Sequence, residues 1–122
     1  MKKFFYVALM ILTMGLMAGC AGSSSKYTKG GPEPVVDTNA ATVNGVHYDD
    51  TTAKCWKVTE TYRAPIVGNV TETNHQWCTE FALVAELEEL MYYWAQVGYG
   101  NASYSYVVDP ASDYESCYAK DE

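Results

Sequence analysis

The sequence has little positive charge. Lys and Arg together number 8 against 15 Asp and Glu, so the 122 residues carry a formal net charge of −7 at pH 7. A general nucleic-acid binder must neutralise a run of phosphates, and so acidic a chain is unsuited to that task. We therefore expect no nucleic-acid partner. The length allows one small domain and not two.

Residue types that build metal and catalytic sites are also scarce. The chain has two histidines, His47 and His75, and four cysteines, and none of them has the close spacing of zinc ligands. Neither a phosphate-binding glycine loop nor a Gly-x-Ser-x-Gly turn occurs. Glu60 and His75 are the only acid–imidazole neighbours that strand pairing suggests. Such a pair could be a general base held by a carboxylate, but a structural hydrogen bond is the favoured interpretation because no nucleophile or oxyanion-forming loop accompanies it. We expect no catalytic residues, no metal and no cofactor.

The N-terminus has the pattern of a targeting segment. Lys2 and Lys3 precede an almost continuously apolar run at residues 4–18, which is shorter than the roughly 20 residues of a bilayer span and is typical of a secretory signal. The run ends in Ala18-Gly19-Cys20. This segment resembles that of a bacterial lipoprotein precursor. There are two alternatives: an ordinary signal peptide followed by an incidental cysteine, and an uncleaved membrane anchor.

The resemblance implies a location and a membrane contact. Residues 1–19 would be the signal peptide, and Cys20 would be the lipidated mature N-terminus that anchors the chain in a membrane. Ala21 after the cysteine favours the outer membrane of the cell envelope, with the domain facing the periplasm. Removing Lys2 and Lys3 with the signal peptide changes the formal net charge from −7 to −9.

Composition divides the rest of the chain into a tether and a domain. Residues 21–42 are rich in Ser, Gly and Pro, and their apolar residues are too scattered to bury a core, so we expect residues 20–45 to be a lipidated N-terminus and flexible tether. Residues 46–122 are expected to form one small domain. At their junction, Asn44-Gly45 is the pair favoured in two-residue hairpin turns.

Two alternating segments, residues 55–63 and 70–78, predict a β-hairpin. Pro65 and Gly68 suit the start and the left-handed end of a four-residue turn between them. With that turn, the numbers of facing residues sum to 133. The more apolar face should then contact the core: Trp56, Val58, Glu60 and Tyr62, with Trp77, His75, Thr73 and Thr71.

This register also predicts a disulfide. It places Cys55 opposite Cys78 and Trp56 opposite Trp77, and facing residues can bring their Cβ atoms within the roughly 4 Å that a disulfide requires. With Cys20 lipidated, three cysteines remain, so at most one internal bridge forms. A bridge from Cys117 to either partner is the alternative, since it would tie the C-terminus to the sheet.

Residues 79–97 have a helical pattern. Thr79 is the expected N-cap, and Glu80 lies in the first turn, where the helix dipole favours an anion. Apolar residues then recur at steps of four and three along one stripe: Leu83, Leu87, Leu90, Trp94 and Val97. Phe81, Val84 and Met91 widen this stripe. Gly98 and Gly100 are expected to end the helix.

Residues 103–109 alternate again and end at Pro110, which predicts a third strand. A right-handed crossover would place this strand beside the first one. The expected fold class is therefore α+β: a small antiparallel sheet of order 2-1-3 with one helix packed on one face. Tyr104, Tyr106 and Val108 should lie beneath the helix with Trp56 and Trp77.

The helix also carries the candidate binding surface. It concentrates Glu86, Glu88 and Glu89 near Tyr92 and Tyr93. Tyrosine supplies rigid amphipathic contact area, although a small domain also uses tyrosines to cover the edge of its core. We take Glu86, Glu89, Tyr92 and Tyr93 as the candidate surface.

These features together predict a lipid-anchored cell-envelope protein without catalytic activity. Its expected role is a binding or accessory module for a protein or glycan of the envelope. The alternative is a periplasmic inhibitor or immunity protein that binds a basic hydrolase, which the negative field of the domain would attract.

Overall fold

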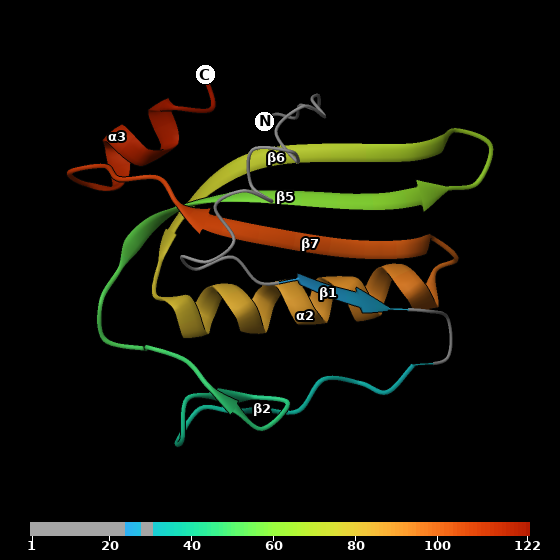
Figure 1. Cartoon of the computed structure of the whole chain (residues 1–122), viewed down its shortest axis with the longest axis horizontal. Helices are drawn as coiled ribbons and strands as arrows, with labels where there is room; N and C mark the ends of the chain where they lie inside the picture. The colour runs from blue at the N-terminus through green and yellow to red at the C-terminus, as the bar shows by residue number, and fades with distance from the viewer. Residues whose placement is uncertain (1–23, 28–30) are drawn as a thin grey trace.

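A computed structural model describes residues 24–27 and 31–122, and it shows a small α+β fold with two antiparallel sheets (Figure 1). The elements are β1 (Ser24–Tyr27), β2 (Val36–Asp37), β3 (Thr42–Val43), β4 (Val46–His47), β5 (Lys54–Ala64), β6 (Gly68–Cys78), α2 (Glu80–Gln96), β7 (Gly100–Val108) and α3 (Tyr114–Ala119). Helix α2 runs along one face of the larger sheet. Among these residues, none of the helices has the length and apolar character to cross a membrane.

The strand order differs from the predicted one. The larger sheet has four strands in the order β1-β7-β5-β6, and β2-β3-β4 form a second sheet. The three expected strands are consecutive neighbours in the larger sheet, as β6, β5 and β7. The order 2-1-3 is nevertheless wrong for the whole sheet, because a fourth strand, β1, pairs with the outer edge of β7.

The extra strands come from the stretch that was expected to be a tether. Strand β1 pairs antiparallel with β7, with Ser25 facing Tyr104 and Tyr27 facing Ala102. Residues 36–47 form the second sheet, which continues across the predicted boundary at residue 46. Part of the expected tether is therefore built into the fold. The apolar residues of this stretch are few and scattered in the sequence, yet Tyr27 and Val43 are buried in the core, where long-range packing places them.

The Asn44-Gly45 turn is confirmed. Asn44 and Gly45 have φ values of 52° and 83°, as a two-residue hairpin turn of this type requires, and they join β3 to β4.

The β5–β6 hairpin forms, but its register is shifted by one residue from the prediction. Ala64 pairs with Gly68, so the loop has three residues rather than four. Ile66 adopts a φ of 73°, rare for a β-branched residue, and the Val67 N–H donates to the Pro65 carbonyl at 2.7 Å. These two features turn the chain earlier than expected. Gly68 has the predicted left-handed conformation, with a φ of 91°.

The shift leaves the predicted face of β5 in place and reverses that of β6, because side chains alternate along a strand. Trp56 and Val58 are buried beneath α2, as expected. Trp56 pairs with Gln76 rather than with Trp77, so Trp77 lies on the opposite face. Tyr104 and Tyr106 complete the core, and the Tyr106 ring meets Trp56 edge-on at 5.4 Å between centroids.

Helix α2 begins as predicted. The Thr79 hydroxyl accepts a hydrogen bond from the Ala82 N–H at 3.3 Å, and Gly98, at a φ of 101°, follows the last turn. The buried stripe is rotated toward Glu88 from the predicted one. It comprises Leu83, Val84, Leu87, Glu88, Met91 and Ala95. Leu90 and Trp94 are half-buried, and Val97 is exposed.

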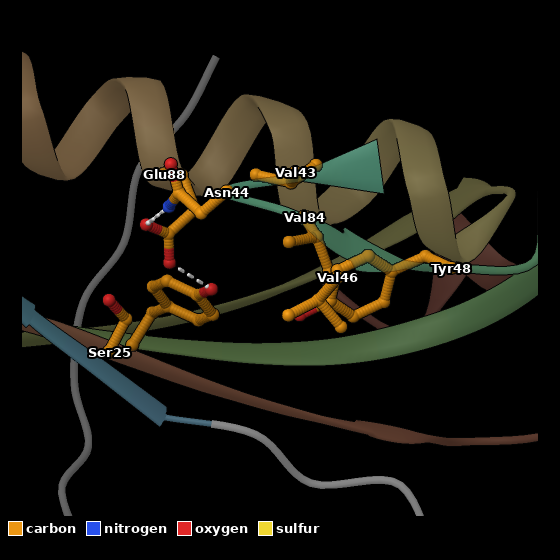
Figure 2. A pocket seen from close by; sticks show the side chains of 8 residues that line it. Ser25, Val43, Asn44, Val46, Tyr48, Val84 and Glu88 are labelled. Atoms are coloured by element: carbon orange, nitrogen blue, oxygen red, sulfur yellow. Dashed lines mark hydrogen bonds between the residues drawn. The ribbon is translucent and has the colours of Figure 1, made fainter. Parts of the chain in front are cut away.

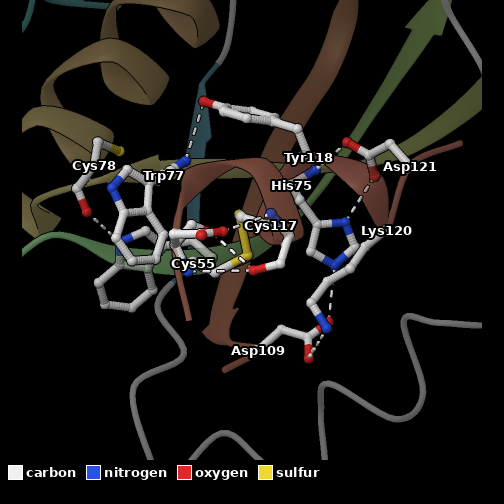
Figure 3. Close-up of a disulfide and its surroundings, with 12 residues drawn as sticks. Cys55, His75, Trp77, Cys78, Asp109, Cys117, Tyr118, Lys120 and Asp121 are labelled. Carbon is white, nitrogen blue, oxygen red and sulfur yellow. Dashed lines mark hydrogen bonds and ion pairs between the residues drawn. A yellow bond between two sulfur atoms is a disulfide. The ribbon is translucent and has the colours of Figure 1, made fainter. Parts of the chain in front are cut away.

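The register shift also overturns the predicted disulfide. Cys78 pairs with Lys54 and belongs to the α2 face, whereas Cys55 belongs to the opposite face, so the two thiols cannot meet. Cys55 instead forms a disulfide with Cys117 in α3, with the two Cα atoms 5.5 Å apart (Figure 3). Helix α3 was not predicted, and Asp113 caps it through a reciprocal pair of bonds with Ser116.

His75 and the C-terminal residues form a cluster beside this disulfide (Figure 3). The His75 Nδ1 lies 2.7 Å from Asp121 Oδ1, and its Nε2 lies 2.8 Å from Asp109 Oδ2. Lys120 Nζ approaches the same Asp109 at 3.5 Å. Glu60 lies on the other face of the sheet, so the suggested Glu60–His75 pair is wrong. Both ring nitrogens of His75 thus lie within hydrogen-bond distance of carboxylate oxygens, which can accept both N–H bonds of a doubly protonated ring.

Candidate functional site

Glu88 is the side chain whose position departs most from the sequence-based expectation. It was grouped with exposed helix glutamates, yet it is only 5% exposed and points from α2 toward the sheet. Three donors meet its carboxylate. The Tyr27 hydroxyl and the Asn44 amide (3.3 Å) donate to Oε1, and the Tyr104 hydroxyl donates to Oε2 at 2.5 Å. Acceptance by both oxygens is the pattern of an ionised carboxylate.

Each donor comes from a different part of the chain. Tyr27 ends β1, Asn44 occupies the turn between β3 and β4, and Tyr104 lies in β7. The turn also orients the Asn44 side chain, because its Oδ1 accepts from the Val35 N–H at 3.0 Å. That bond leaves the Asn44 amide nitrogen free to donate to Glu88. The site therefore exists only when both sheets are assembled against the helix.

A cavity of about 200 Å³ opens beside this carboxylate (Figure 2). Its lining combines polar groups with apolar side chains: Ser25, Val43, Asn44, Val46, Tyr48, Val84, Glu88 and Tyr104. In the close-up, Ser25 and Glu88 lie toward one side of the space, and Val46 and Tyr48 lie toward the other. Polar and charged groups gathered in a partly apolar hollow are typical of a small-ligand site.

The surrounding tyrosines are held in their neutral form. Burial first, and then the hydrogen bond and charge of Glu88, raise the pKa of Tyr27 to about 12. The same causes raise the pKa of Tyr104 further. Burial also raises the pKa of Tyr48, with smaller contributions from the charges of Glu88 and Glu80. These phenols therefore remain hydrogen-bond donors throughout the neutral pH range.

No cationic side chain balances Glu88 within the described residues. The ion pairs among the residues that the structure describes all involve His75 or Lys120, which lie in the cluster beside the disulfide and not near Glu88. A buried charge is costly unless it is paired or fully hydrogen-bonded. Within residues 24–27 and 31–122, the groups that stabilise the Glu88 carboxylate are neutral donors, and the carboxylate faces an open cavity.

The predicted binding surface is only partly assembled. Glu86, Glu89 and Tyr93 are exposed on α2, with Tyr93 at 58%. Tyr92 is half-buried and packs against the core, so it contributes little free area. The sequence did contain a signal for Glu88, since it lies four residues after Val84 and three before Met91 on the buried stripe.

The predicted cysteine sites have different outcomes. Cys20 lies outside the described residues, so its lipidation stays a prediction. Cys78 is a half-buried free thiol, and burial, followed by the charge of Glu86, raises its pKa to about 11. A thiol of this kind is largely protonated and weakly reactive at neutral pH. In residues 24–27 and 31–122, no His, Cys, Asp and Glu side chains gather as a metal-binding group.

Comparison with models of protein families, with curated proteins and with solved structures finds no match.

Proposed function

We propose that this chain is a lipid-anchored protein of the cell envelope that acts as a non-catalytic binding module. The observation that supports a binding role is the Glu88 pocket, which we define as the cavity lined by Glu88, Asn44, Tyr48, Tyr104 and their apolar neighbours. A buried carboxylate without a cationic partner among the described residues, at the wall of an open cavity, suits the capture of a ligand. The N-terminal resemblance supplies the proposed anchor and location.

The binding role can be tested by filling the pocket. Val46 lines the cavity and is 52% exposed, so Val46→Trp should occupy the space at little cost to the fold. We expect the full chain to capture its ligand or partner from solubilised envelopes, and Val46→Trp to lose that capture. Val35→Trp is the matched control, because Val35 is an exposed valine of the same region outside the lining. Equal capture by Val46→Trp and the parent would contradict the proposal.

The anchor can be tested separately with labelled fatty acid. Cys20→Ser should leave an unprocessed chain that incorporates no labelled palmitate. Cys78→Ser is the control, because it removes a free thiol from the folded part and should label like the parent. Equal labelling of Cys20→Ser and the parent would remove the lipoprotein assignment.

A second candidate function is inhibition of a basic hydrolase, and the exposure of Glu86, Glu89 and Tyr93 favours it. Exposed acidic groups steer a basic partner, so association should slow as salt rises. Replacing Glu86 and Glu89 by Gln should slow association and leave the unfolding midpoint nearly unchanged, because exposed carboxylates contribute little to stability. Association that is insensitive to salt and to this double substitution would exclude the inhibitor function at this surface.

A further inference from the structure

We infer that the Glu88 pocket binds a primary ammonium group carried on a short alkyl chain. This inference rests on the proposed binding function and names its ligand class. It follows from the acceptor capacity of Glu88, from the composition of the cavity wall, and from the size and charge of the site.

The carboxylate has capacity for one more donor. Among the residues that the structure describes, Tyr27 and Asn44 donate to Oε1, whereas Tyr104 alone donates to Oε2. Each carboxylate oxygen can accept about two hydrogen bonds, so one position remains on Oε2. A charged N–H donor placed there would form the stronger, charge-assisted kind of bond.

The rest of the wall suits an alkylammonium better than a neutral or anionic ligand. Tyr48 and Tyr104 bring aromatic rings to the cavity, and a cation is attracted to the face of such a ring. Their hydroxyls and the Ser25 hydroxyl can accept N–H bonds. Val43, Val46 and Val84 supply apolar contacts for a hydrocarbon chain. An anion would meet the Glu88 charge with no cationic side chain of the lining to offset it.

The volume of the cavity and the net charge of the chain further limit which ligands can bind. An apolar cavity of about 150 Å³ holds benzene, so a cavity of about 200 Å³ holds roughly six to eight non-hydrogen atoms. A pentylammonium ion and the end of a lysine side chain are both within this size. The excess of 15 acidic over 8 basic residues also favours the approach of cations.

The test is an NMR titration of the ¹⁵N-labelled full chain in detergent, with n-pentylammonium and the neutral probe n-pentanol. We expect pentylammonium to shift the Asn44 side-chain amide signals saturably, and pentanol to bind at least about tenfold more weakly. Glu88→Gln should weaken pentylammonium binding by about tenfold or more. Glu115→Gln, which removes the same charge from an exposed residue of α3, should bind like the parent.

Val46→Trp provides a second variant that leaves the Glu88 hydrogen bonds intact and should abolish pentylammonium binding. Nα-acetyl-lysine amide then separates two sources of the ammonium group. If Nα-acetyl-lysine amide binds as tightly as pentylammonium, the ligand is the lysine side chain of a partner protein. If pentylammonium binds and Nα-acetyl-lysine amide does not, the ligand is a small molecule.

Three results would overturn the inference: pentanol binding as tightly as pentylammonium, full affinity in Glu88→Gln, or no saturable shift with pentylammonium. If the ammonium probe fails while Val46→Trp still abolishes envelope capture, the ligand class is wrong and the binding function stands. If Val46→Trp captures normally, the binding function itself fails.

Discussion

His75 and Glu88 are both more than nine-tenths buried, on opposite faces of the same sheet, and their charges are balanced in different ways. His75 lies between the carboxylates of Asp109 and Asp121, with Lys120 beside them. In the described part of the chain, the donors to Glu88 are the neutral groups of Tyr27, Tyr104 and Asn44. The buried His75 ring is thus paired with groups of opposite charge, whereas the buried Glu88 carboxylate is hydrogen-bonded but has no ion-pair partner among the described residues.

The difference separates a structural cluster from a candidate binding site. The His75 cluster and the Cys55–Cys117 disulfide hold α3 against β5 and β6, and the ring nitrogens of His75 are both occupied. The Glu88 cluster holds two sheets against α2 but keeps an acceptor position and a cavity. A paired charge has little left to offer a ligand, whereas a charge held by neutral donors still attracts a cation.

The largest expected change in the free energy of unfolding comes from removing the Cys55–Cys117 disulfide, which lies beside the His75 cluster. The Cys55–Cys117 bridge joins residues 62 apart, and loop-closure entropy predicts that Cys55→Ser with Cys117→Ser lowers the free energy of unfolding by about 4 kcal/mol. Denaturant unfolding measures this change, and Cys78→Ser is the control. The Asn44 side-chain NMR signals should be retained under native conditions. Stability equal to the parent's would show that α3 adds nothing to the sheet.

A third buried ionisable group, the Glu60 carboxyl, extends the comparison because its charged neighbours disfavour its ionised form. Burial first, and then the charges of Glu72 and Glu86, raise the pKa of Glu60 from the ordinary 4.5 to about 7. The folded state therefore keeps a proton that the unfolded state loses, and stability falls as pH rises from 4.5 to about 7.

Glu60→Gln should abolish this pH dependence, which amounts to about 3 kcal/mol between pH 4 and pH 8. Thermal unfolding across that range measures it, and Glu89→Gln is the exposed control. An unaltered pH profile in Glu60→Gln would contradict the assignment of the slope to this residue.

Removing the cation of the paired site should have an intermediate effect. His75→Gln leaves Asp109 and Asp121 without the imidazolium between them, and we expect a loss of about 2 kcal/mol at neutral pH. His47→Gln is the matched control, because His47 is exposed and its ring contacts the Ala40 carbonyl and no carboxylate of the described residues.

Acid unfolding gives a second measure of the same cluster. Burial would raise the pKa of Asp109, but the hydrogen bond from His75 and the charges of Lys120 and His75 outweigh it, so the pKa lies below its usual value. The stability that Asp109 contributes is present above its ordinary pKa and is lost as pH falls through the lowered one. His75→Gln should therefore move acid unfolding to higher pH, and an unchanged acid transition would argue against the pairing.

The smallest effect is expected at the unpaired charge. Glu88→Gln keeps the shape and an acceptor oxygen for the tyrosines, so the free energy of unfolding should change by about 1 kcal/mol or less. Ultraviolet titration should show the pKa of Tyr27 falling from about 12 toward 10.0, while burial keeps it above that value. A loss as large as that of His75→Gln would erase the proposed difference between the two sites.

Local patterns were sufficient for the parts of the fold that depend on neighbouring residues. The cap at Thr79, the turn at Asn44-Gly45 and the left-handed Gly68 were all predictable, because each depends on a few consecutive residues. The core-facing side of β5 followed from simple alternation. The α+β class followed from the order of these elements.

The sequence by itself therefore determined the fold class, the start of α2 and the face of β5 that meets the core. Only the tertiary structure decided the hairpin register, the Cys55–Cys117 bridge, the pairing of β1 and the burial of Glu88. One residue fewer in the loop exchanges the faces of β6, and no local pattern measures that difference. Glu88 acquires its role from Tyr27, Asn44 and Tyr104, which are brought together only when distant segments pack against one helix.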